Sequence, residues 1–112
     1  MILCSASFFY EIGRVHLLQS RTDEATVWFE KARYAAPEHS PIRAYLASAY
    51  ALNGQAERAA VELVEAQRLA NDDRYSSIAR LMATAYFGVP KIRALFESTY
   101  FVGLRKAGMT AE

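Results

Sequence analysis

Apolar and small residues recur at the three- and four-residue spacing of amphipathic helices through the first part of the chain. The pattern predicts a helix over residues 5–19 and a second over residues 24–35. A polar turn over residues 20–23 joins them into an antiparallel pair, and Pro37 ends the second helix. The positions expected to pack in this pair are Ile12, Gly13, His16, Ala25, Trp28, Phe29 and Ala32. Gly13 is expected to let the neighbouring helix approach closely.

A second helix pair follows with the same register. Ser40 and Pro41 supply a cap residue and a proline at the first helical position, so a helix is expected from there to Leu52. Asn53 and Gly54 both tolerate the left-handed backbone that ends a helix. The next helix, over residues 56–70, places small and apolar side chains where the first pair has Ala25, Phe29 and Ala32. These side chains are Ala59, Leu63 and Ala66.

A third pair is predicted over residues 74–87 and 91–106, with a turn at residues 88–90 and Gly108 marking the end. The residues 71–73 are expected to form the preceding turn and to cap the fifth helix. One face of the sixth helix is expected to pack inward and close the stack. That face consists of Ile92, Leu95, Phe96, Thr99, Val102 and Gly103.

The chain repeats itself with a period of 34 residues, which is the period of tetratricopeptide helix pairs. Signature residues of that family are Gly13, Ala25, Phe29, Ala32 and Pro37 in the first repeat, and Leu46, Tyr50, Ala59 and Ala66 in the second. The segment 46–50 is echoed by 82–86 after 36 residues, so the third repeat is degenerate. The chain therefore resembles the tetratricopeptide repeat family. The resemblance implies one all-α domain over residues 1–112, an αα-superhelix of three antiparallel pairs at about 6–39, 40–73 and 74–108.

The resemblance also implies a non-enzymatic scaffold that binds a peptide or a partner domain in its concave groove. The family's groove positions correspond here to Tyr10, Arg14, Leu17, Ala44, Ser48, Ala51, Arg80, Thr84 and Phe87. The lysine and asparagine set with which some members clamp a terminal carboxylate is missing. We expect Arg14 and Arg80 to bind an acidic group of the partner and Tyr10 and Phe87 to add apolar contact. The alternative is that both arginines are solvated surface residues.

A narrower resemblance covers residues 100–109, which are similar to the ending of bacterial multidomain proteins in which such repeats follow a class III adenylate cyclase domain or a winged-helix regulator domain. This similarity implies an alternative role as a C-terminal regulatory or dimerisation module of such a protein. It concerns context only, because the cyclase's metal-binding and nucleotide-binding residues would lie in a separate upstream domain.

The composition and charge of the chain limit the classes of partner that can be expected. Hydrophobic residues make up 53% of the 112 residues and the formal net charge is +1, so the chain is an ordinary globular one without the basic field that nucleic acids require. No run approaches the roughly 20 apolar residues of a membrane span, and the apolar start lacks the basic region of a secretory signal. Cys4 is the single cysteine, which excludes an intrachain disulfide and favours the cytoplasm.

No arrangement of residues predicts catalysis, a cofactor or a metal site. His16 and His39 lie on different elements, and Cys4 has no basic neighbour in sequence, so a structural histidine, a loop histidine and an unreactive thiol are expected. Asp72 and Asp73 suggest a helix cap more than a cation site. The remaining alternative is a homodimer, because the chain begins with the apolar residues Ile2, Leu3, Phe8 and Phe9, which leave an open end of the stack.

Overall fold

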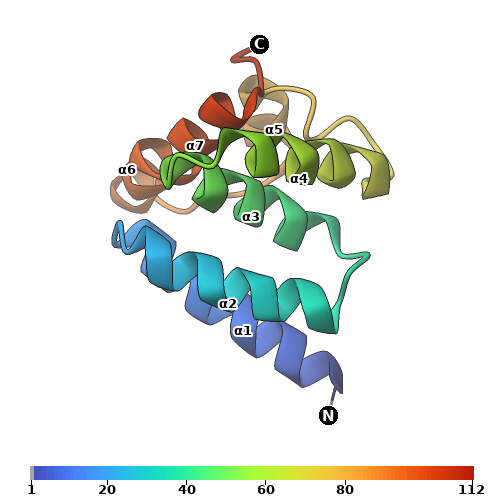
Figure 1. Ribbon diagram of the computed structural model, residues 1–112. Coiled ribbons are helices and arrows are strands. Elements are labelled where there is room, and N and C mark those ends of the chain that lie inside the picture. Colours follow the sequence, from blue (N-terminus) through green and yellow to red (C-terminus); the bar gives the residue numbers. More distant parts are fainter. Residues whose placement is uncertain (1) are drawn as a thin grey trace.

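The computed structural model describes residues 2–112, with side chains from residue 5 onward, and over this range it contains helices and no strand (Figure 1). The helices are α1 (Ile2–Leu18), α2 (Thr22–Ala35), α3 (Ser40–Leu52), α4 (Ala56–Leu69), α5 (Ile78–Thr84), α6 (Pro90–Ser98) and α7 (Tyr100–Ala107). The all-α prediction is confirmed. The bounds of α2, α3 and α4 agree with the sequence prediction within two residues, whereas α1 begins three residues earlier than expected.

The α1–α2 hairpin is held by a close approach at Gly13. A Cβ atom added at Gly13 would lie 2.6 Å from the Phe29 ring, so only glycine lets α1 come this near to α2. Phe29 is fully buried, and so are Ala25 and Ala32 one turn to either side of it on α2. The expected packing role of Gly13 is therefore confirmed.

Helix α3 forms the centre of the molecule. It packs against α2, α4 and α7, and every residue from Ala44 to Ala51 is buried. Such a helix, covered on all sides, is expected for an alanine-rich sequence because small side chains allow several neighbours to approach. It ends at Leu52 with Asn53 as its C-cap, and Gly54 then takes a positive φ of 79°, as the Asn-Gly pair predicted.

The fifth helix is shorter than predicted. Residues 74–77 precede it rather than belong to it, and Ala85 is already extended at φ −139° and ψ 153°. The capping residue is Ser77, whose hydroxyl accepts a hydrogen bond from the Arg80 amide at 3.0 Å. The cap expected from residues 71–73 is therefore wrong. Asp72 instead binds the Arg74 side chain at 3.0 Å, and Asp73 binds Arg80 at 2.8 Å.

Replacing Ser77 by alanine is expected to lower the free energy of unfolding by about 1 kcal/mol, because the first turn of α5 then loses the acceptor for the Arg80 amide. Urea unfolding followed by circular dichroism measures the change. Ser76→Ala is the matched control, since Ser76 is an exposed neighbour whose side chain does not serve as the cap. Equal stabilities of the two variants would contradict the assignment of the cap.

The C-terminal tail holds the start of α5. The amides of Ile78 and Ala79 donate to the carbonyls of Thr110 and Ala111, each at 2.9 Å. These amides belong to the first turn of α5, where a helix offers no carbonyl of its own. The tail therefore completes the hydrogen bonding of a seven-residue helix that would be marginal alone.

The predicted sixth helix is in fact two helices, broken at Thr99. The Thr99 hydroxyl donates to the carbonyl of Leu95 at 2.6 Å, and Ser98 donates to the same carbonyl at 3.2 Å. Hydroxyls that compete for a helical carbonyl weaken the regular backbone ladder. At the break Thr99 has φ −123° and ψ −76°, which is outside the helical range. The single helix over residues 91–106 is thus a wrong prediction.

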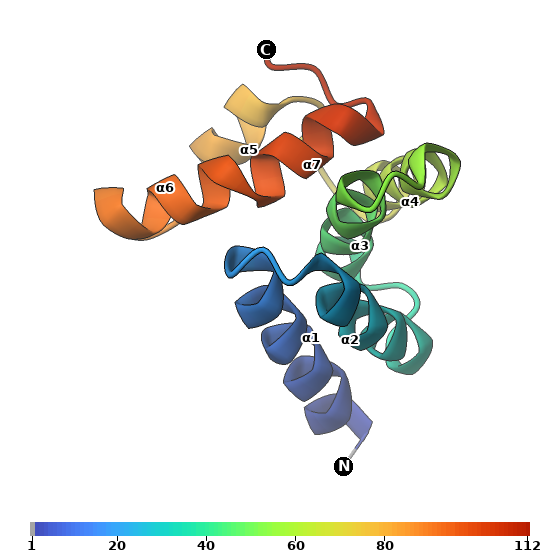
Figure 2. The same cartoon turned by 60° about the vertical axis from the view of Figure 1, so that its left-hand side comes forward.

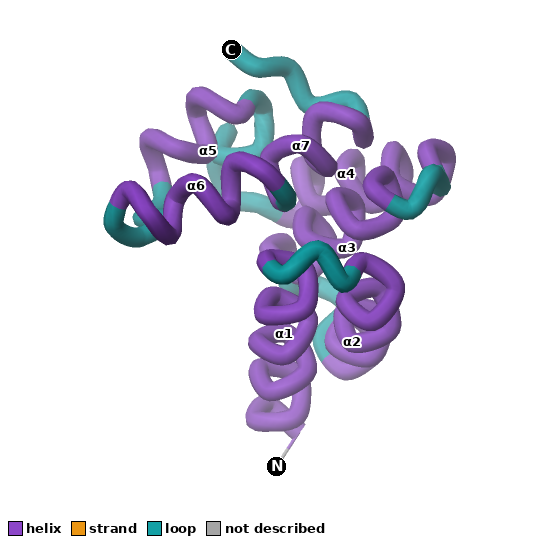
Figure 3. Tube along the Cα trace, turned by 90° about the vertical axis from the view of Figure 1, so that its left-hand side faces the viewer, coloured by secondary structure: helices purple, strands orange, loops and turns teal. Residues whose placement is uncertain are grey.

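Helices α6 and α7 lie end to end and cross the end of the α1–α2 hairpin (Figures 2 and 3). Helix α7 lies directly on α3: the Ser48 hydroxyl donates to the Tyr100 carbonyl at 2.9 Å, and the rings of Tyr45 and Tyr100 stack at 3.8 Å. Gly103 also meets α3 at Ser48. Phe96, Thr99 and Gly103 are buried as predicted, but Ile92 and Leu95 are each 42% exposed, because α6 extends beyond the helices that could cover it.

Candidate functional site

Four of the predicted groove residues lie in the core. Leu17, Ala44 and Ser48 are completely buried and Ala51 is 7% exposed. The groove prediction is wrong for these four, because α7 packs on α3 and the C-terminal end of α1 is covered as well. Their side chains are therefore not accessible to a partner.

The predicted groove residues of the third repeat are Arg80, Thr84 and Phe87, and they do not share one site. Arg80 and Thr84 are exposed on α5, where Arg80 binds Asp73 and the Thr84 hydroxyl bonds back to the Arg80 carbonyl. Residues 82–86 are similar in sequence to residues 46–50 but are not buried like them, since Met82 is 38% and Tyr86 81% exposed. The structure therefore does not bring Arg80 and Arg14 to a common site of the kind the sequence suggested.

Three predicted residues, Tyr10, Arg14 and Phe87, do come together at one cavity. It has a volume of about 180 Å³ and lies where α1, α3, the segment around α5 and α7 meet. We call it the tyrosine cavity. Its lining consists of Tyr10, Arg14, Pro41, Tyr45, Arg74, Tyr75, Leu81, Ala85, Tyr86, Phe87 and Tyr100. Five of the seven tyrosines of the chain are in this lining, but they are spread along the sequence, so no local signal pointed to the cavity.

Arg14 is held among aromatic rings. Its guanidinium carbon lies 5.3 Å from the ring centre of Tyr10, 5.5 Å from that of Tyr45 and 5.9 Å from that of Phe96. Such contacts stabilise a cation and fix its orientation. One Nη atom binds the exposed Glu11 at 3.2 Å, whereas the buried Nε has no hydrogen-bond partner in the described part of the chain. The guanidinium of Arg14 is therefore held mainly by the aromatic rings and by Glu11.

The phenols around Arg14 remain protonated at neutral pH. Burial raises the pKa of Tyr45 to about 12, although Arg14 opposes the shift. Burial also raises the pKa of Tyr10 and of the fully buried Tyr100. A phenol that keeps its proton is a hydrogen-bond donor. The cavity wall therefore combines phenolic donors with a guanidinium.

The lining of the tyrosine cavity contains two arginines and no aspartate or glutamate. Arg74 is bound by Asp72 from outside the lining, through Nε and Nη2 at 3.0 Å each. Donors and cations in the lining favour an anionic group, and the planar guanidinium matches the geometry of a carboxylate or a phosphate. About six water molecules would occupy the volume, which corresponds to room for one side chain rather than for an extended segment.

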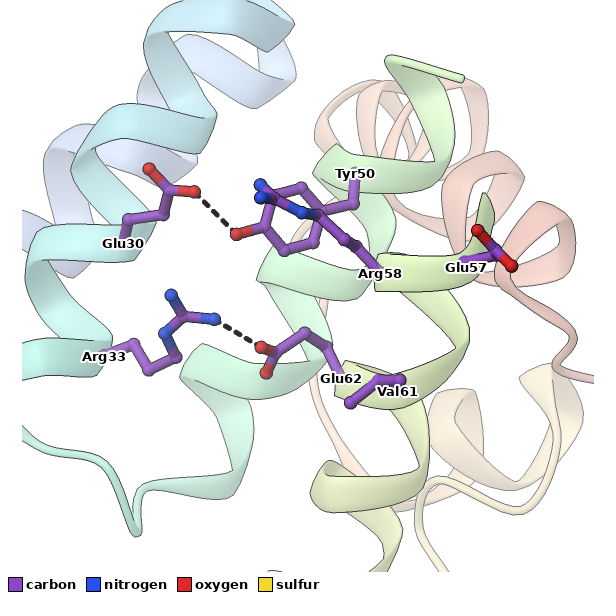
Figure 4. A pocket seen from close by; sticks show the side chains of 7 residues that line it. All are labelled: Glu30, Arg33, Tyr50, Glu57, Arg58, Val61 and Glu62. Carbon is purple, nitrogen blue, oxygen red and sulfur yellow. Dashed lines mark hydrogen bonds and ion pairs between the residues drawn. The ribbon is translucent and has the colours of Figure 1, made fainter. Parts of the chain in front are cut away.

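A larger cleft of about 590 Å³ lies between α2, α3 and α4 (Figure 4). The sequence analysis did not predict it, because all of its lining residues except Tyr50 lie on α2 and α4, whereas the predicted groove positions were taken from the first helix of each pair. Its floor is the Tyr50 ring, with the Arg58 guanidinium 5.6 Å from the ring centre. The Tyr50 hydroxyl donates to Glu30 at 2.6 Å, and burial together with this carboxylate raises the pKa of Tyr50.

The inner wall of this cleft is an ion-paired carboxylate. Glu62 on α4 is only 5% exposed and binds Arg33 of α2 through one oxygen and Arg43 of α3, at 3.0 Å, through the other. Arg43 also donates twice to the Pro37 carbonyl, at 2.9 and 3.1 Å. Because these charges satisfy one another and join three helices, their role in the cleft is structural.

The two histidines form no common centre in the described residues. His16 is half-buried, and its Nδ1 has no hydrogen-bond partner among the described residues. His39 is exposed, with its ring 5.7 Å from that of Tyr10. The side chain of Cys4 lies outside the described residues. Within the described part of the chain, no three His, Cys, Asp or Glu side chains gather as metal ligands would, and no helix is long and apolar enough to cross a membrane.

Comparison with family models, with curated proteins and with solved structures finds no match for this chain. Any proposal for its function is therefore argued from the geometry described above.

Proposed function

We propose that this protein is a non-enzymatic interaction module built from tetratricopeptide-like helix pairs, and that it binds an acidic group of a protein partner in the tyrosine cavity. The repeat is supported by packing. Residues 34 positions apart on α2 and α4 are buried alike: Ala25 with Ala59, Phe29 with Leu63, and Ala32 with Ala66. The third pair departs from this pattern, because α7 rather than α5 packs on α3.

This departure defines the site. In a regular stack, α3 would line an open groove, but here α7 covers the central part of that face. What remains is the tyrosine cavity, beside Tyr10 and Arg14 of α1. The proposed partner therefore inserts one acidic side chain or a chain end, and the surrounding surface contributes the remaining contact.

The observation that carries the proposal is the composition of the cavity wall: two arginines, five tyrosines and no carboxylate. Arg14 already has its ring contacts in place, so binding an acid requires little ordering of that side chain. Glu11 is exposed and sits on the outer side of Arg14, where an exposed ion pair contributes little and a partner's carboxylate can replace it.

The test is a titration of the isotope-labelled protein, followed by nuclear magnetic resonance, with a short peptide that ends in two glutamates. The same peptide with glutamines is the ligand control. We expect the acidic peptide to shift resonances around the tyrosine cavity, and the variant Arg14→Gln/Arg74→Gln to bind it at least tenfold more weakly, because both cations are lost.

Arg68→Gln is the matched control variant, because Arg68 is an exposed arginine of α4 that is paired with Glu65 and is not part of the cavity lining. Its affinity for the acidic peptide should equal that of the unchanged protein. Circular dichroism establishes that each variant is folded. If the double variant binds the peptide as well as the unchanged protein, or the glutamine peptide binds equally, the proposed site is wrong.

A further inference from the structure

Helix α6 and its capping residue Val89 present an apolar stripe that the rest of the described chain covers only in part. Val89 is 56% exposed, and Ile92 and Leu95 follow at helical spacing at 42% each. Apart from its continuation α7, the other helices make few contacts with α6. Figure 2 shows α6 extending away from the rest of the molecule. The stripe is thus free for another chain.

Two cations flank this stripe. On a helical projection Lys91 lies to one side of Ile92 and Arg93 to the other, and both side chains are exposed. Among the described side chains neither has an ion-pair partner. They also occupy the first turns of α6, where the positive end of the helix dipole disfavours a cation. Local helix energetics therefore does not account for their position.

The outer face of α2 begins with two acidic residues. Val27 is 49% exposed and Tyr34, two turns further along the same face, is 91% exposed. Asp23 and Glu24 lie at the start of this face, exposed and without an ion pair among the described residues. Two cations lie nearby: Arg21, which is exposed and directly precedes α2, and Lys31, whose ammonium lies 4.4 Å from the centre of the Trp28 ring.

We propose that α6 of one copy docks on α2 of a second copy, and that α2 of the first receives α6 of the second. The stripe of Val89, Ile92 and Leu95 then packs against Val27 and Tyr34, while Lys91 and Arg93 face Asp23 and Glu24. A two-fold axis forms both contacts at once, which is the commonest arrangement of a homodimer. The second copy is the occupant, because this chain itself carries both complementary surfaces.

Reversing the charges on one surface or the other provides a test of the proposed dimer. The variant Lys91→Glu/Arg93→Glu has acidic residues on both surfaces, and Asp23→Lys/Glu24→Lys has basic residues on both. Each variant alone should therefore be monomeric, because like charges meet in its dimer. In an equal mixture both contacts join opposite charges, so a heterodimer should form. Light scattering and sedimentation at several protein concentrations measure the masses, against a monomer of 12.6 kDa.

A second pair of variants tests the apolar stripe without altering charge. Ile92→Ser/Leu95→Ser should weaken dimerisation at least tenfold, whereas Val15→Ser, at a 53% exposed position of α1, should leave it unchanged. Circular dichroism checks that all variants are folded. The exposed positions are chosen so that folding does not depend on them.

The proposal is wrong if the unchanged protein is monomeric at every concentration, if the serine variant dimerises as well as the unchanged protein, or if the mixed charge variants do not associate. Association with an added basic or acidic protein, without self-association, would point to a different occupant and also overturn it. The test is independent of the tyrosine cavity: Arg14→Gln/Arg74→Gln should dimerise normally, since neither arginine lies on α2 or α6.

Discussion

The variant Gly103→Ala is expected to lose about 2 kcal/mol of unfolding free energy. A Cβ atom at this position would lie 2.0 Å from the Ser48 hydroxyl oxygen and 2.6 Å from the Ser48 carbonyl oxygen. Alanine in a helix normally gains about 1 kcal/mol over glycine, but overpacking of this severity costs about 3 kcal/mol. The clash wins because α3 is enclosed and its backbone carbonyl cannot move aside as a flexible side chain could.

Chemical unfolding in urea measures this loss, and Gly13→Ala is the comparison. A Cβ atom at Gly13 would meet the Phe29 ring at 2.6 Å, which is a side chain rather than a backbone. Its destabilisation should therefore be smaller than that of Gly103→Ala. If Gly103→Ala is as stable as the unchanged protein, α7 does not lie on α3 at the distance described, and the closure of the predicted groove has to be abandoned.

The variant Glu62→Ala is expected to be destabilised by about 3 kcal/mol. It removes the buried carboxylate that Arg33 and Arg43 share, and leaves two partly buried guanidiniums without their common partner. The loss falls at the lower end of the range for breaking buried pairs, because Arg33 remains about one-third exposed and can be rehydrated. Three helices, α2, α3 and α4, are joined by this residue, so the effect is on the global stability.

Glu65→Ala is the matched control for this prediction. Glu65 is on the same helix and pairs with Arg68 at 2.9 Å, but both side chains are exposed to solvent to a larger extent. An exposed pair contributes less than about 1 kcal/mol, so the control should remain close to the unchanged protein in urea unfolding. Similar losses in the two variants would show that Glu62 is not the buried link between the helices.

The first two helix pairs could be predicted from the sequence because each of their signals is local. Proline at the start of α3 and Asn53-Gly54 at its end act on adjacent residues, and the small side chains at Ala25 and Ala59 mark a packed face by their spacing alone. Gly13 belongs to the same group, since a glycine at a packed position indicates close approach before the neighbour is known.

The third pair could not be predicted in this way. Residues 82–86 repeat the chemistry of 46–50, but Tyr50 is 2% exposed and Tyr86 is 81% exposed, because Tyr50 lies in a surrounded helix and Tyr86 follows the end of a short one. The break at Thr99 likewise depends on the hydrogen bond from its hydroxyl to the Leu95 carbonyl. The periodicity of apolar residues does not indicate that this bond forms.

The site shows the same division. Tyr10, Arg14 and Phe87 were predicted as binding residues, and all three line the tyrosine cavity. Tyr45, Arg74 and Tyr100 were missed, because their positions depend on which helix packs against α3. The peptide titration tests the proposal that this cavity binds an acidic group.

The sequence by itself determined that the chain is all-α, where its first four helices run and which small-residue faces they pack. Only the tertiary structure decided that α7 packs beside α3, so that a cavity lies where the sequence predicted an open groove. The physical reason is distance along the chain: the bond from Ser48 to Tyr100 joins residues 52 positions apart, and the stacking of Tyr45 on Tyr100 is of the same kind. Contacts of this range leave no periodic pattern in the sequence, because they depend on the shapes of both surfaces after each helix has formed.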